Sequence, residues 1–385
     1  MKRTALLLIL ALALLISLTL VMQSPKSRPK TVVVPDDYPT IQAAIGNAVA
    51  GNTILVKSGI YSENLVVDKG VTIKSQMGAE NTIVRTPSSL NQRHIFEVTV
   101  DNVTISGFTV TGTNGDAGAG IYLREVNYCT ISDNVCYNNS AGVYLYNSSN
   151  NIIMNNDISS NGDGIYSHQS DNNKVINNIV SKSTERGIML AFSSNNHLSN
   201  NTVNSNGNGI IVGERGAKKN LIVNNTIVFS SNAGIHLFAA ENNWILNNTL
   251  MKNGRGIWLR GESKTNEIAN NAFIDNSYGI YLGDSLKPLE DCLKNIIYHN
   301  NFVDNRDSVH IYESISICDD VYLDVHNIVC EPLSIWDYGY PSGGNYWSDY
   351  NGSDIDHDGI GDTPYVIDPN NQDNYPLISL HDIVD

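Results

Sequence analysis

The sequence predicts an all-β protein in which short strands coil into a parallel β-helix, a solenoid of stacked rungs. Two columns of residues repeat at nearly constant spacing. Asparagine pairs begin at intervals of 22 to 24 residues, at Asn155, Asn177, Asn200, Asn224, Asn247 and Asn270. Glycines followed by Ile or Val recur at intervals of 22 to 25 residues, at Gly120, Gly142, Gly164, Gly187, Gly209, Gly234, Gly256 and Gly279. A fixed period of this length is typical of a solenoid, whose units bury their apolar faces against one another.

Inside each unit the apolar residues alternate as they do in β-strands. In the segment GIYL, Ile121 and Leu123 share one face and Tyr122 takes the other. No unit contains the i, i+3, i+4 apolar spacing of a helix. Short alternating runs separated by Asn, Ser and Gly fit a β-helix whose strands stack about 4.8 Å apart.

The asparagine pairs are interpreted as part of the scaffold. Stacking places each residue above its counterpart in the next rung, so identical amides can hydrogen-bond in a ladder. Removing one amide would leave its neighbours buried and unpaired, at a cost of about 1–3 kcal/mol each. A second column is interpreted as turn residues, at Asn151, Asn173, Asn196, Asn220, Asn243 and Asn266.

The N-terminal segment has the pattern of an export signal. Residues 1–23 carry Lys2 and Arg3 ahead of an apolar run from Ala5 to Val21. Such a run is short for a membrane span but suits a signal peptide. No clear cleavage site follows, so a cleaved signal and an uncleaved anchor through residues 5–21 both remain open. We expect residues 24–31 to form a linker, and the rest to be secreted, periplasmic or held at the cell surface.

The β-helix is predicted to span residues 32–334, with regular rungs over about 116–310. At its start, apolar residues have helical spacing at Ile41, Ala44, Ile45, Ala48 and Val49. This pattern predicts a short helix that caps the open end of the solenoid. The repeat is interrupted after Gly279, where LKPLEDCL is the predicted insertion. Residues 335–385, rich in Asp, Tyr and Trp, are predicted to form a small C-terminal module.

Charge and cysteine content narrow the possible partners and covalent bonds. A net charge of −15 argues against nucleic acid as a partner. Cys129 and Cys136 should not pair, because the strand between them separates them by roughly 20 Å, whereas a disulfide needs Cα atoms within about 7 Å. Cys318 and Cys330 are the better candidates for a disulfide, which leaves Cys292.

Three features together resemble the NosD-like family of parallel β-helix proteins, especially its exported archaeal members. They are the rungs, the segment PTIQAAI, and the tail GGNYWSDYNGSDIDHDGIGDTPYVIDPNNQDNYPL. The resemblance covers about residues 32–380 and implies a right-handed, single-stranded, pectate-lyase-like solenoid. The rung pattern alone is shared with pectate lyases, polygalacturonases and alginate epimerases, so it indicates a fold rather than an activity.

The resemblance implies two alternative functions. The family's named member is a periplasmic copper-binding protein that serves the maturation of nitrous oxide reductase. Copper would need Cys, Met and His ligands close together, and the methionines beyond the signal region form no Met-x-x-Met pattern, at Met77, Met154, Met189 and Met251.

Relatives that bind or hydrolyse sugars imply a polysaccharide hydrolase, lyase or epimerase as the other alternative. The best cluster for such chemistry comes from successive rungs and consists of Glu214, His236, Arg255 and Arg260. These residues are equally consistent with solvated charges on a sheet. The Gly-His-Gly and Arg-Ile-Lys motifs of polygalacturonases are absent, so we assign no catalytic residue.

The segment DIDHDGIGD has the ligand spacing of a calcium loop. Asp354, Asp356, Asp358 and Asp362 occupy positions 1, 3, 5 and 9, and the carbonyl of Ile360 occupies position 7. Position 12 is Tyr365 rather than the bidentate Glu of an EF-hand. Four carboxylates this close repel one another without a cation, so a structural calcium ion is predicted.

Aromatic residues are predicted to form two outward-facing columns along the solenoid. Alternation after each glycine places one residue outward and the residue two positions later outward again. The aromatic, histidine and arginine members of these columns are Tyr122, Arg124, Tyr144, Tyr146, Tyr166, His168, His236, Phe238, Trp258, Arg260 and Tyr281. Aromatic residues are also good strand formers, which is the alternative interpretation. A long apolar stripe on an exported acidic protein favours a binding surface, and flat rings beside arginines suit a polysaccharide or cell-surface glycan.

Overall fold

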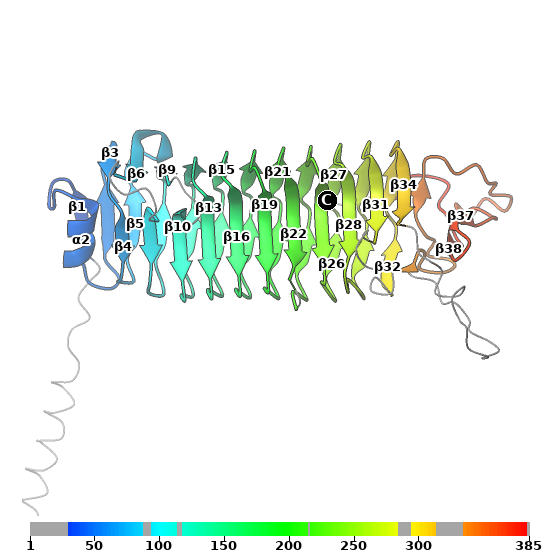
Figure 1. Cartoon of the computed structure of the whole chain (residues 1–385), viewed down its shortest axis with the longest axis horizontal. Helices are drawn as coiled ribbons and strands as arrows, with labels where there is room; N and C mark the ends of the chain where they lie inside the picture. The colour runs from blue at the N-terminus through cyan, green and yellow to red at the C-terminus, as the bar shows by residue number, and fades with distance from the viewer. Residues whose placement is uncertain are drawn as a thin grey trace, which may run out of the picture.

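The computed structural model confirms an all-β parallel β-helix. It describes residues 30–87, 94–113, 118–214, 216–283, 294–312 and 334–382. The body is elongated, with helix α2 (Ile41–Asn47) at one end and the C-terminal loops at the other (Figure 1). The signal segment, the insertion LKPLEDCL, and Cys292, Cys318 and Cys330 lie outside the described residues. Over the described ranges, the only helix with α geometry is far too short to cross a bilayer.

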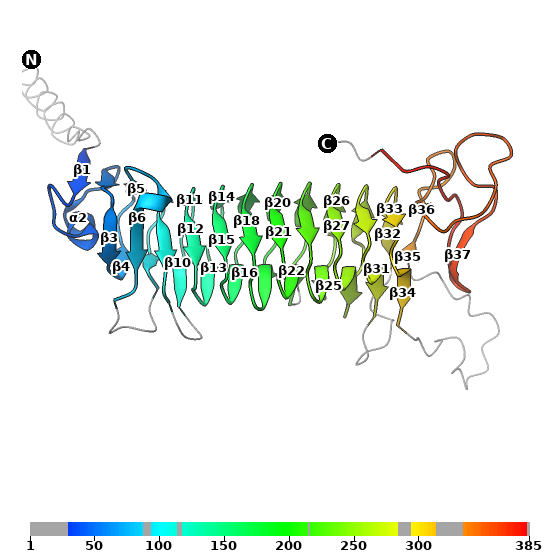
Figure 2. The same cartoon turned by 90° about the horizontal axis from the view of Figure 1, so that it is seen from above.

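Each complete rung adds one strand to each of three parallel sheets, which run the length of the molecule (Figure 2). The first sheet contains β1 (Thr31–Val34), β2 (Thr53–Val56), β5 (Thr72–Ser75), β8 (Thr104–Ser106), β11 (Thr130–Ser132), β14 (Ile152–Met154), β17 (Lys174–Ile176), β20 (His197–Ser199), β23 (Leu221–Val223), β26 (Trp244–Leu246), β29 (Glu267–Ala269), β32 (Asn295–Tyr298) and β35 (Ser334–Ile335).

The second sheet follows the first along each rung. It contains β3 (Gly59–Ser62), β6 (Thr82–Arg85), β9 (Thr109–Thr111), β12 (Val135–Tyr137), β15 (Asp157–Ser159), β18 (Ile179–Ser181), β21 (Thr202–Asn204), β24 (Thr226–Val228), β27 (Thr249–Met251), β30 (Ala272–Ile274), β33 (Asn301–Val303) and β36 (Tyr346–Trp347).

The third sheet closes each rung with longer strands. It contains β4 (Leu65–Val67), β7 (Phe96–Val98), β10 (Ala119–Arg124), β13 (Ala141–Tyr146), β16 (Asp163–His168), β19 (Arg186–Ala191), β22 (Asn208–Gly213), β25 (Ala233–Phe238), β28 (Arg255–Arg260), β31 (Tyr278–Leu282) and β34 (Asp307–Ile311). A separate antiparallel pair, β37 (Tyr365–Asp368) and β38 (Asn371–Asp373), and the short 3-10 helix η1 (Ala79–Asn81) complete the described elements.

The core is a stack of aliphatic side chains in register. Ile121 pairs with Val143, and Val143 with Ile165, and all three are fully buried. Inward-facing apolar residues recur in the same way in the other two sheets, so the core side chains of each rung pack against those of the rung before and the rung after. A rung therefore buries its apolar surface only when both neighbours are present.

The second asparagine of each pair forms the predicted ladder. The main-chain N–H of Asn201 donates to Asn225 Oδ1 at 2.9 Å, and Asn201 Nδ2 donates to the same oxygen at 2.9 Å. Asn201 Nδ2 also donates to the carbonyl of Val175 in the preceding rung, at 2.8 Å. Each buried amide thus ties its own rung to both neighbours. The first asparagine of each pair is instead the turn residue, with a positive φ of 55° at Asn200.

The column that begins at Asn151 is also a buried ladder, so the interpretation of these residues as turn formers is wrong. Asn151 and Asn173 are almost fully buried, and the N–H of Asn151 donates to Asn173 Oδ1 at 2.8 Å. The left-handed turn is made one residue earlier, for example by Asn150 with φ of 59°. A third ladder, with some serines, runs where the second sheet meets the third. Every corner of the solenoid therefore carries its own column of buried polar side chains.

The repeated glycine is required by close packing between rungs. A Cβ on Gly142 would lie 2.8 Å from the carbonyl oxygen of Gly164 in the next rung. The same conflict recurs along the column, so any side chain would push successive rungs apart. Cys129 and Cys136 are buried and free, which confirms that they do not pair with each other.

Helix α2 caps the N-terminal end as predicted, burying Ile41, Ala44 and Ile45. A side chain of the helix also forms hydrogen bonds with the exposed edge of a strand. Gln42 both donates to the carbonyl of Val66 at 3.2 Å and accepts from the N–H of Val66 at 2.8 Å. These two bonds satisfy groups on the outermost strand of the third sheet, β4.

The first sheet is closed at the same end by an acidic residue, Asp37. Asp37 Oδ2 accepts from the N–H of Val33 at 2.8 Å, and the N–H of Asp37 donates to the carbonyl of Val33 at 2.8 Å. Val33 lies on β1, the outermost strand of the first sheet. Side chains and loop backbone therefore take the place of a missing strand on both edges.

The C-terminal residues continue the solenoid before they cover it. β35 and β36 pair with β32 and β33, and Asn345 extends the asparagine ladder from Asn300. Stacked aromatic rings extend the core in the same direction: Phe302 stacks on Trp347 at 4.4 Å and Trp347 on Tyr365 at 4.2 Å. Asp373 ends the ladder, because its Oδ2 accepts from the N–H of Asn345 at 2.7 Å.

Replacing one ladder asparagine should cost far more stability than replacing its exposed neighbour. Asn178→Ala leaves the buried N–H of Asn156 unpaired, at about 1–3 kcal/mol, and removes two hydrogen bonds from Asn178 Nδ2, to Ile153 and Asn201, at about 0.5–1.5 kcal/mol each, so the total cost is about 2–6 kcal/mol. Asn177→Ala is the matched control, since Asn177 is exposed with φ of 56° and its loss should cost about 1 kcal/mol. Thermal unfolding compares the two variants. Equal melting temperatures would contradict a stabilising ladder.

The carboxyl of Asp373 should make stability depend on pH. Burial raises the pKa of Asp373 to about 6, although Asn345, Trp347 and Tyr375 donate hydrogen bonds that lower it. The native state therefore retains a proton that the unfolded state releases, so stability from this group increases as pH falls from 7 towards 4, by up to about 3 kcal/mol.

The test measures the melting temperatures of the wild type and of Asp373→Asn at a series of pH values between 7.5 and 4.5. We expect the melting temperature of the wild type to rise relative to that of the variant as pH falls. A difference that stays constant, or that changes in the opposite direction, would show that Asp373 is ionised throughout this range.

Candidate functional site

The outer face of the third sheet carries the two columns that the sequence predicts. Successive strands pair Tyr122 with Tyr144, Tyr144 with Tyr166, and His236 with Trp258. The second column is in register beside it, with Arg124 next to Tyr146 and Phe238 next to Arg260. We call this face the aromatic stripe, consisting of Tyr122, Arg124, Tyr144, Tyr146, Tyr166, His168, His236, Phe238, Trp258, Arg260 and Tyr281.

The N-terminal half of the aromatic stripe is accessible. Tyr122, Tyr144 and Tyr166 are half-buried, and the rings of Tyr144 and Tyr166 stack at 4.9 Å with 15° between their planes. In the second column, the rings of Tyr146 and His168 stack at 5.6 Å and 9°. Both columns therefore offer ring surface and polar ring edges to solvent.

Three tyrosines of this half, Tyr122, Tyr144 and Tyr166, are neutral hydrogen-bonding groups. Burial raises the pKa of Tyr144 to about 12, and it also raises the pKa values of Tyr122 and Tyr166. Their phenols can therefore both donate and accept hydrogen bonds. Burial lowers the pKa of His94, whose ring stacks on Tyr122 at 4.1 Å, so a neutral imidazole extends the row.

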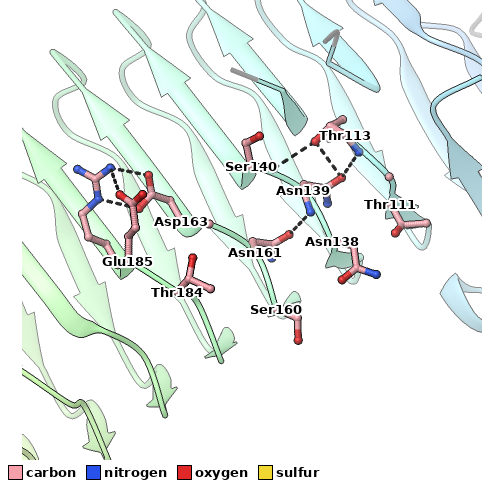
Figure 3. Close-up of a pocket in the computed structure, with 13 residues that line it drawn as sticks. Thr111, Thr113, Asn138, Asn139, Ser140, Ser160, Asn161, Asp163, Thr184 and Glu185 are labelled. Atoms are coloured by element: carbon pink, nitrogen blue, oxygen red, sulfur yellow. Dashed lines mark hydrogen bonds and ion pairs between the residues drawn. The ribbon is translucent and has the colours of Figure 1, made fainter. Parts of the chain in front are cut away.

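A polar groove runs beside the N-terminal half, where the second sheet meets the third (Figure 3). Its volume is about 850 Å³. Hydroxyl, amide and charged side chains from four successive rungs line it, including Thr113, Asn138, Ser140, Thr184 and Glu185. Such a lining offers hydrogen-bond donors and acceptors without a large apolar surface.

One ion pair joins the polar groove to the aromatic stripe. Arg186 donates from Nε to Asp163 Oδ1 at 2.6 Å and from Nη2 to Asp163 Oδ2 at 2.8 Å (Figure 3). The guanidinium group also lies over the ring of Tyr166, at 5.0 Å from its centroid. Asp163 is 8% exposed, and burial raises its pKa even though Arg186 lowers it. The pair forms a wall that is shared by the groove and the stripe.

The C-terminal half of the aromatic stripe is more tightly packed. His236 and Tyr281 are buried, and the ring of His236 stacks on Trp258 at 4.4 Å. Arg255 lies between Trp258 and Tyr281, at 4.5 Å from each ring centroid, and Arg260 lies over Trp258 at 4.7 Å. Three of the four residues considered for catalysis from the sequence, His236, Arg255 and Arg260, therefore gather around Trp258, although no catalytic residue is assigned. Between the two halves, Met189 and Ile211 replace aromatic residues and are buried.

The groove was missed by sequence reasoning. Asp163 and Arg186 occupy the column immediately before the repeated glycine, and the register pairs them directly. Oppositely charged residues in one column of successive rungs were the available signal. The Asn, Ser and Gly residues between strands predicted the corners but not the space between them, because the groove depends on which corner side chains are short.

The predicted calcium loop brings three of its carboxylates together. Ligand oxygens of Asp354, Asp356 and Asp358 all lie within 4.8 Å of one another. The loop is shaped by its own main chain: Asp354 accepts from the N–H groups of Asp358 at 3.1 Å and Gly359 at 3.0 Å. Asp362 is turned onto the N–H of Ile355 at 2.6 Å, outside this cluster.

Charge repulsion is evident within the loop. Partial desolvation and the charge of Asp358 raise the pKa of Asp356. For Asp354, desolvation acts to raise the pKa, but main-chain N–H groups outweigh it and hold the pKa below its usual value. An all-carboxylate set of this kind suits a hard divalent cation. The carbonyl of the largely buried Ile360 is not part of the cluster of side-chain ligands.

A copper site does not fit the described residues. The aspartate cluster is the single group of three or more candidate metal ligands in the described ranges. Met154, Met189 and Met251 lie in the first, third and second sheets, respectively. Burial raises the pKa of Cys129 to about 11 and that of Cys136 to about 12, which disfavours the thiolate form in which a cysteine would bind copper.

Solved structures with the same fold include several carbohydrate-active proteins. The A-module of the Azotobacter vinelandii mannuronan C-5 epimerase AlgE6 is 16% identical, with a TM-score of 0.58, and the match covers 71% of this chain and 91% of that chain. The A-module of AlgE4 from the same organism is 15% identical, with a TM-score of 0.51 over 70% and 89% of the two chains. The Dettilon tailspike protein is 17% identical, with a TM-score of 0.55 over 73% and 68%. These similarities show the fold alone.

Sequence comparison gives a closer relationship. A cell surface glycoprotein of Methanothermus fervidus is 35% identical over 103 residues, which is 26% of this chain and 16% of that protein. The chain thus matches only a small part of this relative. The family model described as periplasmic copper-binding protein (NosD) matches residues 45–217 and 186–352, which together span most of the β-helix. The chain therefore belongs to the NosD family.

Proposed function

We propose that this chain is an exported, non-catalytic carbohydrate-binding protein that holds an extended glycan along the outer face of its third sheet. The observation that carries the proposal is the position of Arg186, which borders the polar groove and stacks on Tyr166. A sugar chain has apolar ring faces and a rim of hydroxyl groups. The half-exposed tyrosines suit the faces, and the adjoining groove suits the hydroxyls.

The regular spacing of the rungs supports a polymer rather than a small ligand. Tyr122, Tyr144 and Tyr166 repeat once per rung in exact register, about 4.8 Å apart. A linear polysaccharide presents a similar repeat, one sugar unit after another. Several weak stacking contacts can therefore be made along one ligand, which raises affinity by effective concentration.

The relatives are consistent with this function and with an extracellular place. One relative is named a cell surface glycoprotein, and the family is described as periplasmic. Proteins with the same fold and under 20% identity include alginate epimerases. We infer that the partner is a polysaccharide or cell-surface glycan, and that the aromatic stripe is its contact surface.

We also propose that the C-terminal loop binds a structural calcium ion. Asp354, Asp356 and Asp358 would hold it, because their oxygens converge within 4.8 Å. Ile360 and Asp362 complete the predicted ligand set only if the loop adjusts, since Asp362 bonds to Ile355 in this structure. The same loop is joined to the C-terminal residues that cover the end of the solenoid, because Ile360 forms a β-bridge with Leu377. Calcium would thus stabilise the C-terminal end of the solenoid.

Removing rings from the aromatic stripe should weaken glycan binding. The variant Tyr144→Ala, Tyr146→Ala, Trp258→Ala loses three contacts worth about 0.5–1.5 kcal/mol each, so we expect at least a tenfold rise in Kd. Affinity electrophoresis in gels containing polygalacturonate, alginate or hydroxyethyl cellulose measures retention directly.

The matched control removes exposed aromatics that lie outside the aromatic stripe, Trp244 on the first sheet and Phe229 in the turn that follows β24. Their side chains are 39% and 51% exposed. The control variant Phe229→Ala, Trp244→Ala should bind like the wild type, and both variants should still melt cooperatively. Equal retention of all three proteins, or no retention of any of them on these polymers, would argue against the proposed function.

Calcium should raise the melting temperature of the wild type. A ligand at ten times its Kd stabilises the native state by about 1.4 kcal/mol. Melting in calcium and in EDTA measures the effect. Asp356→Asn should abolish the difference, whereas Asp68→Asn, at an exposed carboxylate far along the chain, should not. A melting temperature unaffected by calcium would refute the metal site.

A further inference from the structure

The acceptor sequence for N-glycosylation, Asn-x-Ser/Thr, occurs seven times and avoids every ladder asparagine. The acceptors are Asn102, Asn138, Asn147, Asn200, Asn224, Asn247 and Asn351. Asn247 is half-buried and the other six are exposed. This distribution follows partly from the fold, because the residue two positions after an asparagine of the two ladders that flank the first sheet points into the core and is apolar, as Ile153 and Val203 are.

The fold does not explain why three successive rungs carry a complete acceptor sequence. Thr202, Thr226 and Thr249 pair in register on the outer face of the second sheet. The same column holds Asp157 and Ile179 in the rungs before them. The position therefore accepts charged, apolar or hydroxyl residues, and threonine is not a requirement of the scaffold.

The three acceptor asparagines lie at the same corner, in the same conformation. Asn200, Asn224 and Asn247 have φ of 55°, 56° and 56°, where the chain turns from the first sheet to the second. The main-chain N–H of Asn200 donates to Val223 in the next rung, at 3.4 Å, so the backbone is fixed. The side chain of Asn200 and the hydroxyl-bearing Thr202 are both exposed. Asn224 and Thr226 are exposed in the same way.

We propose that Asn200, Asn224 and Asn247 carry N-linked glycans, which form a row along this corner. In the reaction, the side-chain amide nitrogen bonds to the anomeric carbon of a diphosphate-linked sugar donor. The bond from that carbon to the donor phosphate breaks, the diphosphate leaves, and the amide loses one proton to solvent. The donor is supplied by the export pathway, not by this chain.

The position of the row makes it compatible with ligand binding. In a three-sheet solenoid, the corner between the first and second sheets lies opposite the third sheet. Glycans there project away from the aromatic stripe and leave it open. Other acceptors are placed differently: Asn138 lines the polar groove, and Asn147 follows Tyr146 directly. Ser149, the hydroxyl residue for Asn147, already accepts a hydrogen bond from the N–H of Asp171 at 3.0 Å.

The test is mass spectrometry of glycopeptides from the full chain, exported by a host that performs N-glycosylation. We expect sugar mass on all three asparagines of the wild type. The variant Thr202→Val, Thr226→Val, Thr249→Val keeps the asparagines and the β-branched shape but should lose all three glycans. Thr31→Val, at an exposed strand residue outside any acceptor sequence, should leave them in place.

Single variants keep the test valid if the triple variant folds poorly. Thr202→Val alone should remove the glycan from Asn200 and leave those on Asn224 and Asn247. Exported wild-type protein with these three asparagines unmodified would overturn the proposal, whether or not other acceptors carry sugar. Persistence of sugar on Asn200 in Thr202→Val would overturn it as well.

Discussion

The buried amide ladder is the interaction on which the rest of the molecule depends. A ladder asparagine ties its own rung to both neighbouring rungs. The main-chain N–H and the side-chain Nδ2 of Asn178 both donate to Asn201 Oδ1 in the next rung, and Asn178 Nδ2 also donates to the carbonyl of Ile153 in the rung before. These bonds set both the spacing and the register of the rungs. Register in turn aligns outward side chains into columns. The aromatic stripe is therefore a consequence of polar bonds inside the corners, not of attraction between the rings themselves.

The repeating part of the fold could be predicted from the sequence because each rung copies the same constraints. Gly142 must be glycine since a Cβ there would lie only 2.8 Å from the next rung's carbonyl oxygen, and Ile121 must be apolar since both neighbouring rungs cover it. Such constraints recur at a fixed interval and are visible without coordinates. The capping helix was predictable for a different reason: the open end of a solenoid must be covered, and the apolar residues before the first rungs have helical spacing.

What is unique to one rung could not be predicted in this way. Asp163 and Arg186 stand in one column, but no other pair of successive described rungs in that column carries opposite charges, so the repeat itself does not reveal their contact. The role of Asn151 was misjudged because Asn is common both in turns and in ladders, and only burial distinguishes the two. The aspartate loop was predictable from local spacing, but the hydrogen bond between Asp362 and the N–H of Ile355 was not, since it depends on how the main chain of the loop folds.

The two closed strand edges at the N-terminal end have a consequence for how copies of this chain meet. A solenoid with bare ends could add a second molecule as though it were one more rung, and then a third, growing into a fibre at high concentration. Head-to-tail growth needs an open edge at both ends of every copy. Gln42 and Asp37 occupy the hydrogen-bonding groups of Val66 and Val33 that an incoming strand would need. The bonds at these two edges therefore disfavour the head-to-tail addition of a second copy through the first and third sheets.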